Sequence, residues 1–566
     1  MLTLKRFNIL LLTFLLGSSV NAAGSNPMDA GSMSVCQCQP RNGGTVTFAL
    51  GGEEDAYPWK SSAAHTQITP VYGNLFIRDP YNDKLIPDLA THWKVSKDLT
   101  KGTFHLRKGV KFHDGTPFTA KDVEWSIMLT SKPEAEGMDF IYGAARLNEL
   151  KGAQDFVDGK TKNIEGIQVI DDHTIVLETS VPNGRFFDLI GKVYILPEHL
   201  YRNYSWEKIP QLAWNSPEVR VGTGPFKVEE HVDGQYLSLV ANENYWAGRP
   251  YLDRMIFKFF AEHETGTLAF EKGEVDVLEF LTAEEIRRFG KNPEGTVLLR
   301  ATPLSPNYIN TADKPFLKDK RVRQAISYAI NRQQMIDTLI PGIRDPMDSL
   351  FPLGHPNYNP NAKRYPYDPE KARALLKEAG WDPNQEVELS TYYKSQESLD
   401  WLAFIQMYLT RVGIKIKVRQ MEWADMEKAG KAGKLGLWFT GYSQDVVADH
   451  MAYFGADGSW NFGKYNNSKY DDLLTKANRS GGEELKEILF EMQEIFNEEL
   501  PGIPFWNRTK FTIGKQKICN VVEPYTDGHF GYRNLENVFI CEDSKNTITV
   551  RPKTPNGLGH PGYIAP

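Results

Sequence analysis

One continuous stretch, Gly102–Ser126, constrains the fold of this chain more than any other. Apolar residues alternate with polar ones at 104–106 and again at 110–112, which predicts two short strands. Asp114–Gly115 has the composition of a hairpin turn. A further strand is predicted at Gly44–Leu50, where the alternation is similar.

Helix signals follow these strands. Thr119 is a favourable N-cap and Asp122 comes three residues later, which is the pattern of a capping box. Between 321 and 336, apolar residues recur at helical spacing and predict a helical segment with one buried face. Another helix is predicted over 369–380, with Asp368 as its N-cap, a proline at its first position and a glycine at its end.

Leu435–Asp445 combines a strand with candidate binding residues. It begins as an apolar and aromatic run, which is consistent with a buried strand, and breaks at Gly441. Tyr442 and Asp445 then fall in a loop, where an aromatic face and a carboxylate can receive an ammonium group. The alternative is that Asp445 caps an ordinary strand-to-helix turn, and these residues alone leave both interpretations open.

Length and composition limit the class of protein. A chain of 566 residues suggests two or three lobes, and 41% hydrophobic residues are enough for a substantial core. The mean hydropathy of -0.44 excludes a polytopic membrane protein. The net charge of -7, without any cluster of Lys and Arg interleaved with aromatics, argues against a nucleic-acid partner.

Residues 1–22 have the pattern of a secretory signal peptide. Lys5 and Arg6 form its basic region, Ile9–Leu16 is apolar but too short to span a bilayer, and Val20–Ala22 offers small residues for cleavage. Removal of this segment would change the net charge from -7 to about -9. Because no cysteine follows closely, we expect a soluble periplasmic protein without a lipid anchor.

The chain has four cysteines, Cys36, Cys38, Cys519 and Cys541, which allow three pairings. In an oxidising compartment the natural pair is Cys519 with Cys541, and such a bridge contributes on the order of 3 kcal/mol. Cys36 and Cys38 are two residues apart, which is poor disulfide geometry, and no histidine nearby supports a metal or redox role. They lie in the segment 23–43, which we expect to be a disordered leader.

From about residue 44 to residue 540 the chain resembles the family 5 extracellular solute-binding proteins, the peptide- and nickel-binding group that serves ABC importers. The resemblance depends on several motifs that occur in the same order. These motifs are Gly102–Ser126, Ile195–Leu200, Val221–Val228, Asn242–Trp246, Ala269–Asp276, Asp319–Asn331 and Tyr367–Trp381.

The resemblance implies an α/β fold like that of type II periplasmic binding proteins, with two lobes joined by a hinge and an accessory third domain. The chain is expected to cross between the lobes more than once. The implied segments are the signal peptide 1–22, the leader 23–43, lobe I (44–74, 219–303 and 506–543), the accessory domain II (75–218), lobe III (304–505) and an irregular tail (544–566).

The resemblance also implies a binding site. In peptide-binding members the segment aligned with Gly441 to Asp445 is typically Gly-Trp-x-x-Asp, whose aspartate receives the α-ammonium group of the ligand. If these roles are transferred to this chain, Asp445 is the ammonium acceptor and Tyr442 takes the place of the tryptophan. Gly441 then offers its backbone to the main chain of the ligand. Many relatives continue with Asp-Pro, whereas this chain has Val446–Asp449, which puts peptide specificity in question.

Three further residues are implied as ligand contacts. Trp423 matches an aromatic residue that lines the side-chain pocket in relatives, although it could equally be part of the core. Ser61 and Ser62 lie in the early loop that lends main-chain contacts to the ligand.

Catalysis has little support in the sequence. The Gly-x-Ser-x-Gly, Ser-x-x-Lys with Lys-Thr-Gly, and His-Glu-x-x-His motifs are absent. The 12 histidines show no ligand spacing, and we expect Glu262–Glu264, with its central histidine, to be a solvated turn rather than a metal site. We therefore expect no enzyme, no metal and no cofactor.

The resemblance implies a periplasmic monomer that captures a short peptide or peptide-like amine by hinge closure and delivers it to an ABC permease. Alternatives on the same scaffold are an oligosaccharide, an opine-type conjugate or a nickel chelate, although Asp445 disfavours neutral sugars. A secreted hydrolase is a more distant alternative, because it would need an activated nucleophile beside a base.

Overall fold

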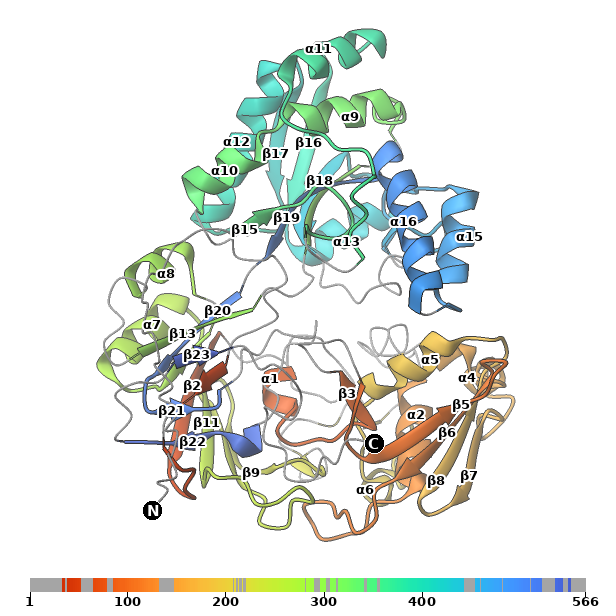
Figure 1. The fold of residues 1–566 in the computed structure, drawn as a ribbon, viewed down its shortest axis with the longest axis vertical. Coiled ribbons are helices and arrows are strands. Elements are labelled where there is room, and N and C mark those ends of the chain that lie inside the picture. The colour runs from red at the N-terminus through yellow and green to blue at the C-terminus, as the bar shows by residue number, and fades with distance from the viewer. Residues whose placement is uncertain are drawn as a thin grey trace, which may run out of the picture.

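A computed structural model describes most of the chain between residues 33 and 550. Within the described residues, the three largest sheets have seven, six and four strands. The six-stranded sheet and its helices lie at the top of Figure 1, above the other two. The described residues are 33–35, 38–51, 65–78, 85–131, 147–206, 208–209, 212, 216, 220–279, 281–289, 296–301, 306–311, 314–340, 344–353, 357–441, 453–458, 460–480, 482–508, 510–521, 535–542 and 548–550.

The seven-stranded sheet is built from the segments expected for lobe I. Its strand order is β13-β20-β12-β2-β11-β10-β9. The central strand β2 pairs in parallel with β11 and β12, and the outer pairs are antiparallel. β2 confirms the strand predicted at 44–50. The strands are β2 (Thr45–Gly51), β9 (Phe226–Val232), β10 (Tyr236–Ala241), β11 (Arg254–Phe260), β12 (Val277–Leu278), β13 (Thr296–Ala301) and β20 (Lys510–Lys515).

The six-stranded sheet forms the centre of lobe III. Its order is β15-β19-β14-β18-β16-β17. The strand β16 runs parallel to β17 and β18, whereas β14 is antiparallel to both of its neighbours. β18 confirms the buried strand predicted to end at Gly441. The strands are β14 (Pro306–Thr311), β15 (Arg344–Pro346), β16 (Glu386–Thr391), β17 (Lys415–Gln420), β18 (Leu437–Gly441) and β19 (Gly502–Arg508).

The four-stranded sheet belongs to the accessory segment and is antiparallel throughout. The capping box predicted before helix α2 is confirmed, since the Thr119 N–H donates to the Asp122 carboxylate over 2.8 Å. The second strand predicted at 110–112 is reduced to an isolated bridge between Lys111 and Pro117. The elements are β5 (Ala90–Val95), β6 (Lys101–Leu106), α2 (Ala120–Thr130), β7 (Ile167–Asp171) and β8 (Thr174–Glu178).

Helices surround the sheet of lobe III (Figure 1). The segment 321–336, predicted as helical, forms two helices, because α9 ends at Ala329 and the Asn331 side chain caps α10. The predicted cap of α11 is confirmed, since the Asp368 carboxylate accepts the Lys371 N–H over 2.9 Å. The helices are α9 (Lys320–Ala329), α10 (Arg332–Leu339), α11 (Pro369–Glu378), α12 (Gln396–Arg411), α13 (Trp423–Lys431), α15 (Ser468–Ala477) and α16 (Gly482–Glu499).

The described strands carry the chain between the two large sheets at two points. β13 of the seven-stranded sheet precedes β14 of the six-stranded sheet, and β19 precedes β20. Ala301 pairs with Lys510, so both connections leave the seven-stranded sheet at the same end. Pro306 pairs with Asn507, so both also reach the six-stranded sheet at one end. These two sheet ends, which we call the meeting ends, are therefore where the lobes join.

The apolar core also extends across this junction. Ile309 and Phe439 of the six-stranded sheet belong to the same buried cluster as Leu278 and Ile513 of the seven-stranded sheet. The other face of the seven-stranded sheet contributes to a separate cluster that contains Phe48. The expected α/β fold is thus confirmed, whereas the exact domain boundaries remain a prediction.

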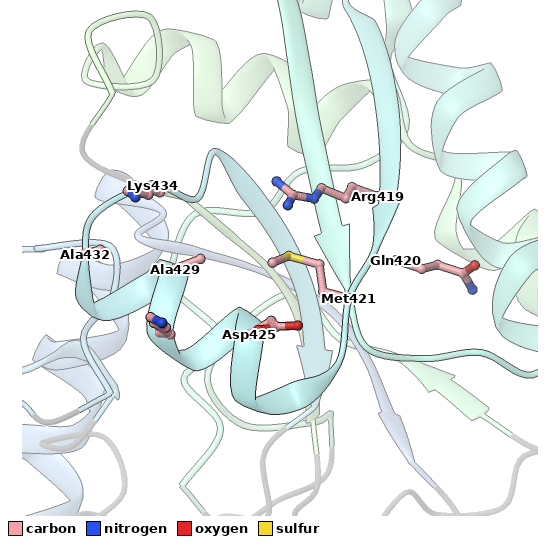
Figure 2. Close-up of a pocket in the computed structure, with 8 residues that line it drawn as sticks. Arg419, Gln420, Met421, Asp425, Ala429, Ala432 and Lys434 are labelled. Atoms are coloured by element: carbon pink, nitrogen blue, oxygen red, sulfur yellow. The ribbon is translucent and has the colours of Figure 1, made fainter.

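A surface hollow of about 420 Å³ lies on lobe III, where β17 leads into α13 (Figure 2). Figure 2 shows Arg419 and Lys434 on its rim, with Met421 between them. Neither Gly441 nor Trp423 lines it. Because most of its lining residues are exposed and half of them are charged, the hollow lacks the apolar, enclosed character of a small-molecule site.

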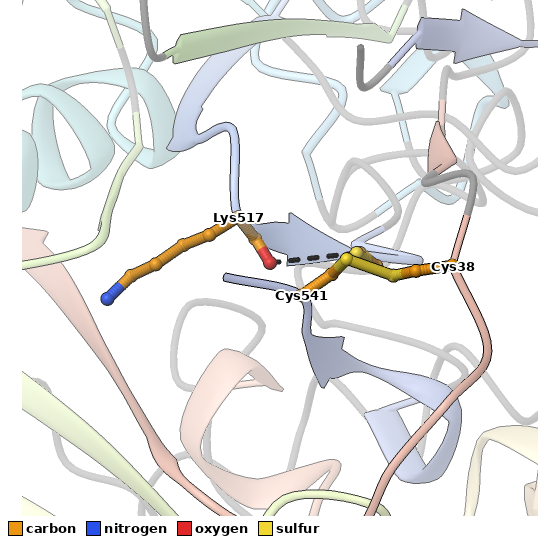
Figure 3. The surroundings of a disulfide bond; sticks show 4 residues. Cys38, Lys517 and Cys541 are labelled. Atoms are coloured by element: carbon orange, nitrogen blue, oxygen red, sulfur yellow. Dashed lines mark hydrogen bonds between the residues drawn. A yellow bond between two sulfur atoms is a disulfide. The ribbon is translucent and has the colours of Figure 1, made fainter. Parts of the chain in front are cut away.

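The predicted disulfide between Cys519 and Cys541 is wrong. Cys541 is bonded to Cys38, with a Cα–Cα distance of 6.6 Å (Figure 3). Cys519 is engaged in another disulfide. The register explains the error, because β21 and β22 pair Cys519 with Phe539 and so place Cys541 two residues beyond it. Such diagonal neighbours are too far apart for a disulfide. These strands are β21 (Ile518–Cys519) and β22 (Phe539–Ile540).

Two short strands, one near each end of the chain, also pair with each other. β1 (Met33–Val35) and β23 (Ile548–Val550) form an antiparallel pair. These strands lie within the leader and the tail, which were expected to be irregular, so that expectation is wrong at these positions. Cys36 lies outside the described residues, as does the predicted signal peptide. Within the described residues, no helix is long and apolar enough to cross a membrane.

Candidate functional site

Three parallel strands of lobe III end beside one another, and candidate binding residues follow each of them. β16 leads directly into Tyr392 and Tyr393, β17 into Trp423, and β18 closes at Gly441. Open α/β sheets bind ligands at the carboxyl ends of their parallel strands, because loops from several strands converge there. This end of lobe III is therefore the candidate site.

The register places the candidate site at the meeting end. Gly441, the last residue of β18, pairs with Asn307. Asn307 is the second residue of β14, the strand that enters the sheet from lobe I. The candidate site thus opens toward the junction with lobe I.

A hydrogen-bonded chain fixes Gly441. Its N–H donates to the Tyr393 hydroxyl over 2.9 Å, and the Asn307 amide donates to the same hydroxyl over 3.2 Å. The Trp506 indole donates in turn to the Asn307 Oδ1 over 3.1 Å. Trp506 and Asn307 are almost fully buried, so the chain anchors Gly441 to the core. The Gly441 N–H is therefore used within the protein.

Four partly buried aromatic residues, Tyr392, Tyr393, Trp423 and Trp460, form what we call the aromatic shelf. Trp423 stacks on Trp460 with ring centroids 5.3 Å apart, and Tyr392 meets Trp423 edge-on at 5.1 Å. The ring centroids of Tyr392 and Tyr393 are 4.4 Å apart. Such a shelf can contact apolar or planar groups of a ligand and retains part of its surface for them.

An ion pair borders the shelf. Lys394, which follows the two tyrosines, pairs with Glu422, which precedes Trp423. Both side chains are more than half exposed, at 58% and 70%, so the pair contributes little to stability. It nevertheless connects the loop after β16 with the start of α13.

Lobe I presents a matching set of strand ends. β2, β11 and β12 are mutually parallel, and β12 runs antiparallel to β20, the strand that arrives from lobe III, so that β12 ends toward the start of β20. The carboxyl ends of these three strands therefore also point toward the meeting end. Along the chain β2 is followed by the segment 52–64, which includes Ser61 and Ser62 and lies outside the described residues.

The Glu262–Glu264 segment is not the solvated turn that the sequence predicts. His263 starts α7 (His263–Lys272) and its Nε2 lies 2.7 Å from the Glu285 carboxylate on α8 (Ala283–Phe289). This hydrogen bond raises the pKa of His263. Burial opposes the ionisation of Glu285, but its hydrogen bonds with His263, Thr267 and Thr282 prevail and lower its pKa to about 2. The pair joins two helices of lobe I.

The structure brings two of the predicted site residues together. Gly441 and Trp423 lie at the same end of the lobe III sheet. Tyr442, Asp445, Ser61 and Ser62 lie outside the described residues, so their roles remain predictions.

The sequence interpretation missed Tyr392, Tyr393 and Trp460. Two consecutive tyrosines directly after an alternating strand were the available signal, because strand ends are where binding residues gather. Trp460 is far from Trp423 in the sequence and only the fold brings them into contact.

Comparisons with known proteins agree with this geometry. Residues 84–464 match the profile of Bacterial extracellular solute-binding proteins, family 5 Middle. The chain is 31% identical over 394 residues to a protein of Brucella ovis assigned as an ABC transporter peptide-binding protein, with 68% of this chain and 70% of that one covered. It is 27% identical over 553 residues to heme-binding protein A of Haemophilus influenzae, with 92% and 96% covered.

A solved structure is similar over nearly the same extent. It is the ABC transporter-associated periplasmic binding protein DppA of Helicobacter pylori, in complex with the peptide STSA. The two chains are 25% identical, the TM-score is 0.71, and the match covers 88% of this chain and 98% of the other.

Proposed function

Because the chain belongs to the bacterial extracellular solute-binding proteins of family 5, we propose that it captures a short peptide, or a peptide-like amine, between lobes I and III. One observation carries this proposal: both large sheets direct the carboxyl ends of their parallel strands to the meeting ends. A ligand held there contacts both lobes and stabilises the form in which they are closed.

The ligand contacts that we propose on lobe III are Asp445, Tyr442, Gly441 and Trp423. Asp445 accepts the α-ammonium group, with Tyr442 beside it. The described neighbours support this arrangement, because the hydrogen bond to Tyr393 anchors Gly441, the residue directly before Tyr442. The aromatic shelf around Trp423 then receives a side chain of the ligand.

On lobe I, we propose that Ser61 and Ser62 contribute main-chain contacts, since their loop follows the carboxyl end of β2. The proposed domain limits are those implied by the resemblance, with lobe I at 44–74, 219–303 and 506–543 and lobe III at 304–505.

The proposed setting is the periplasm, reached through the signal peptide 1–22, where the protein acts as a monomer and delivers its ligand to an ABC permease. Members of the family are transport binding proteins. We propose that this chain likewise performs no chemical step and releases its ligand unchanged.

A planar ligand is the second candidate. The aromatic shelf favours it, because stacked rings can cover a flat group, and a relative that covers most of the chain is a heme-binding protein. Under this alternative the shelf supplies the main contact and a free amino group on the ligand is unnecessary.

The test is to identify what the protein carries and what becomes of it. Mass spectrometry of the ligand that co-purifies should find a peptide or peptide-like amine. A cognate ligand at about 100 times its dissociation constant should stabilise the fold by roughly 2.7 kcal/mol and reduce the radius of gyration. Recovery of a cleaved product at catalytic rates would contradict the proposal, and recovery of a porphyrin would favour the second candidate.

A further inference from the structure

Two histidines lie opposite each other on the four-stranded accessory sheet. β5 is the edge strand of this sheet and runs antiparallel to its neighbour β6 (Figure 1). The register of these two strands pairs His92 with His105. Their rings are stacked, with centroids 4.4 Å apart and planes inclined by 17°. We call these two residues the histidine pair.

The histidine pair lies on the outer face of the sheet. The next residues in the register, Trp93 and Phe104, also face each other, and both stack on Phe76 in the core. Because side chains alternate along strands, His92 and His105 point to the opposite face. His92 is exposed and His105 is half-buried there. The core contacts of the neighbouring residues hold the two backbones, so the histidine pair sits on a rigid support.

Thr91, at the irregularity of β5 just before His92, fixes the tautomer of that histidine. The Thr91 hydroxyl has one proton, which it donates to the His105 carbonyl oxygen over 3.1 Å. The Thr91 oxygen lies 3.0 Å from His92 Nδ1 and therefore accepts, so Nδ1 carries the ring proton. The Nε2 atom of neutral His92 then keeps its lone pair. A hydrogen bond from the second ring nitrogen is typical of a metal-binding histidine.

The spacing of the two rings suits a single metal ion. Metal–nitrogen bonds of about 2.0–2.1 Å place two nitrogens on one ion about 3–4 Å apart. Rings whose centroids are 4.4 Å apart reach that separation by a small rotation of their side chains. Within the described residues the His105 ring contacts His92 and makes no hydrogen bond, so it can turn toward the ion.

The chemistry of the histidine pair selects the kind of metal. Imidazole nitrogen suits copper and zinc, whereas Mg²⁺ and Ca²⁺ take oxygen ligands, and Cu²⁺ binds more tightly than Zn²⁺. Within the part of the chain that the structure describes, no group of three or more His, Cys, Asp or Glu side chains could hold a metal ion. The histidine pair therefore supplies two ligands, and water on the exposed face completes the coordination.

We propose that the histidine pair binds one Cu²⁺ ion, or less tightly one Zn²⁺ ion, on the outer face of the accessory sheet. His92 Nε2 and a ring nitrogen of His105 are the protein ligands, and Thr91 is a positioning residue that orients His92. The ion joins the edge strand β5 to β6. The site lies away from the meeting ends, so this inference goes beyond the proposed function and does not depend on the ligand.

The test is Cu²⁺ binding by the full chain without residues 1–22, in a glycine buffer that keeps the ion off single histidines. Calorimetry should find one equivalent bound by the wild type, and electron paramagnetic resonance should show two imidazole nitrogens on the ion. His92→Gln and His105→Gln should each weaken binding about 100-fold, because the advantage of two linked ligands is lost. The double variant should bind little more weakly than either single variant, because the two residues act as a unit.

Thr91→Val should weaken Cu²⁺ binding about 10-fold, as expected when a metal-binding histidine loses its second hydrogen bond. Thr103→Val is the matched control, because Thr103 lies on the same outer face of β6, two residues before His105. His263→Gln, which removes a histidine of lobe I, is a second control. Both controls should bind Cu²⁺ like the wild type. All variants at the exposed face should melt close to the wild type without metal, so weaker binding does not report unfolding.

Three results would overturn the inference. The first is wild-type binding that survives in the double variant, which would place the ion elsewhere. The second is a loss of separate equivalents in the two single variants, which would indicate two independent single-histidine sites. The third is a wild-type spectrum with fewer than two imidazole nitrogens, or no binding in this buffer, and it decides the matter even if a variant fails to fold.

Discussion

The two meeting ends share one geometry but differ in chemistry. In both lobes, parallel strands deliver their carboxyl ends to the junction. Lobe III supplies aromatic rings and a glycine anchored by Tyr393, whereas lobe I supplies the buried carboxylate of Glu279 beside Thr512. The shared geometry supports the proposal that a ligand is received at the junction, and the different residues at the two ends support the proposal that each lobe contacts a different part of it.

The largest effect is expected at Asp445. Asp445→Asn keeps the shape of the side chain and removes its charge, so the affinity for a ligand with a free amino group should fall by about 2–5 kcal/mol. N-acetylation of the ligand should cause a similar loss in the parent protein. Calorimetry of both proteins with free and acetylated ligand measures these effects, with Asp543→Asn as a control that should bind like the parent. Equal binding by Asp445→Asn and the parent would leave Asp445 as a structural cap.

A smaller effect is expected from Tyr393, which supports the lobe III end. Tyr393→Phe removes the oxygen that accepts from the Gly441 N–H and the Asn307 amide. Leaving partly buried donors unsatisfied should lower the free energy of unfolding by about 1–3 kcal/mol. Urea titration measures it, and Tyr367→Phe is the matched control because Tyr367 is 40% exposed. Similar stabilities of the two variants would show that this chain of hydrogen bonds does not anchor the lobe III end.

The smallest effect concerns His263 and Glu285 on lobe I. The pKa of His263 is raised above 6.5 by its hydrogen bond to Glu285, so its contribution is full below pH 6.5 and is lost as pH rises through the raised pKa. The pKa of Glu285 is lowered from 4.5 to about 2, so its contribution is full above pH 4.5 and is lost as pH falls toward 2. The stabilisation by this pair is therefore greatest between about pH 4.5 and pH 6.5.

This pH dependence can be checked with His263→Gln. The variant should lose less stability than the parent between about pH 6 and pH 8, with a difference below about 1 kcal/mol because His263 is partly exposed. Urea titrations at both pH values measure the difference. Identical pH profiles for the two proteins would mean that the α7–α8 contact does not depend on the charge of His263.

Local sequence signals predicted the elements well. The capping box at Thr119, the cap of α11 at Asp368 and the end of β18 at Gly441 all depend on residues within a few positions of one another. The break between α9 and α10 was missed, because the apolar spacing continues through it while Asn331 interrupts the backbone.

Features that depend on pairing between distant strands could not be read in the same way. The disulfide prediction paired the two cysteines near the C-terminus, but the β21–β22 register sets Cys519 and Cys541 apart, and Cys541 bonds to Cys38 instead. Likewise, Glu279 acquires its neighbour Thr512 only through the pairing of β12 with β20. Part of the proposed site, including Asp445, therefore still depends on the family resemblance.

The Cys38–Cys541 bond has a consequence for how the protein is made. Its two thiols are 503 positions apart, so the first one synthesised must wait until nearly the whole chain has followed. A chain that terminates anywhere before the second thiol cannot close the bond. Closure of this bond therefore requires that synthesis has passed residue 541.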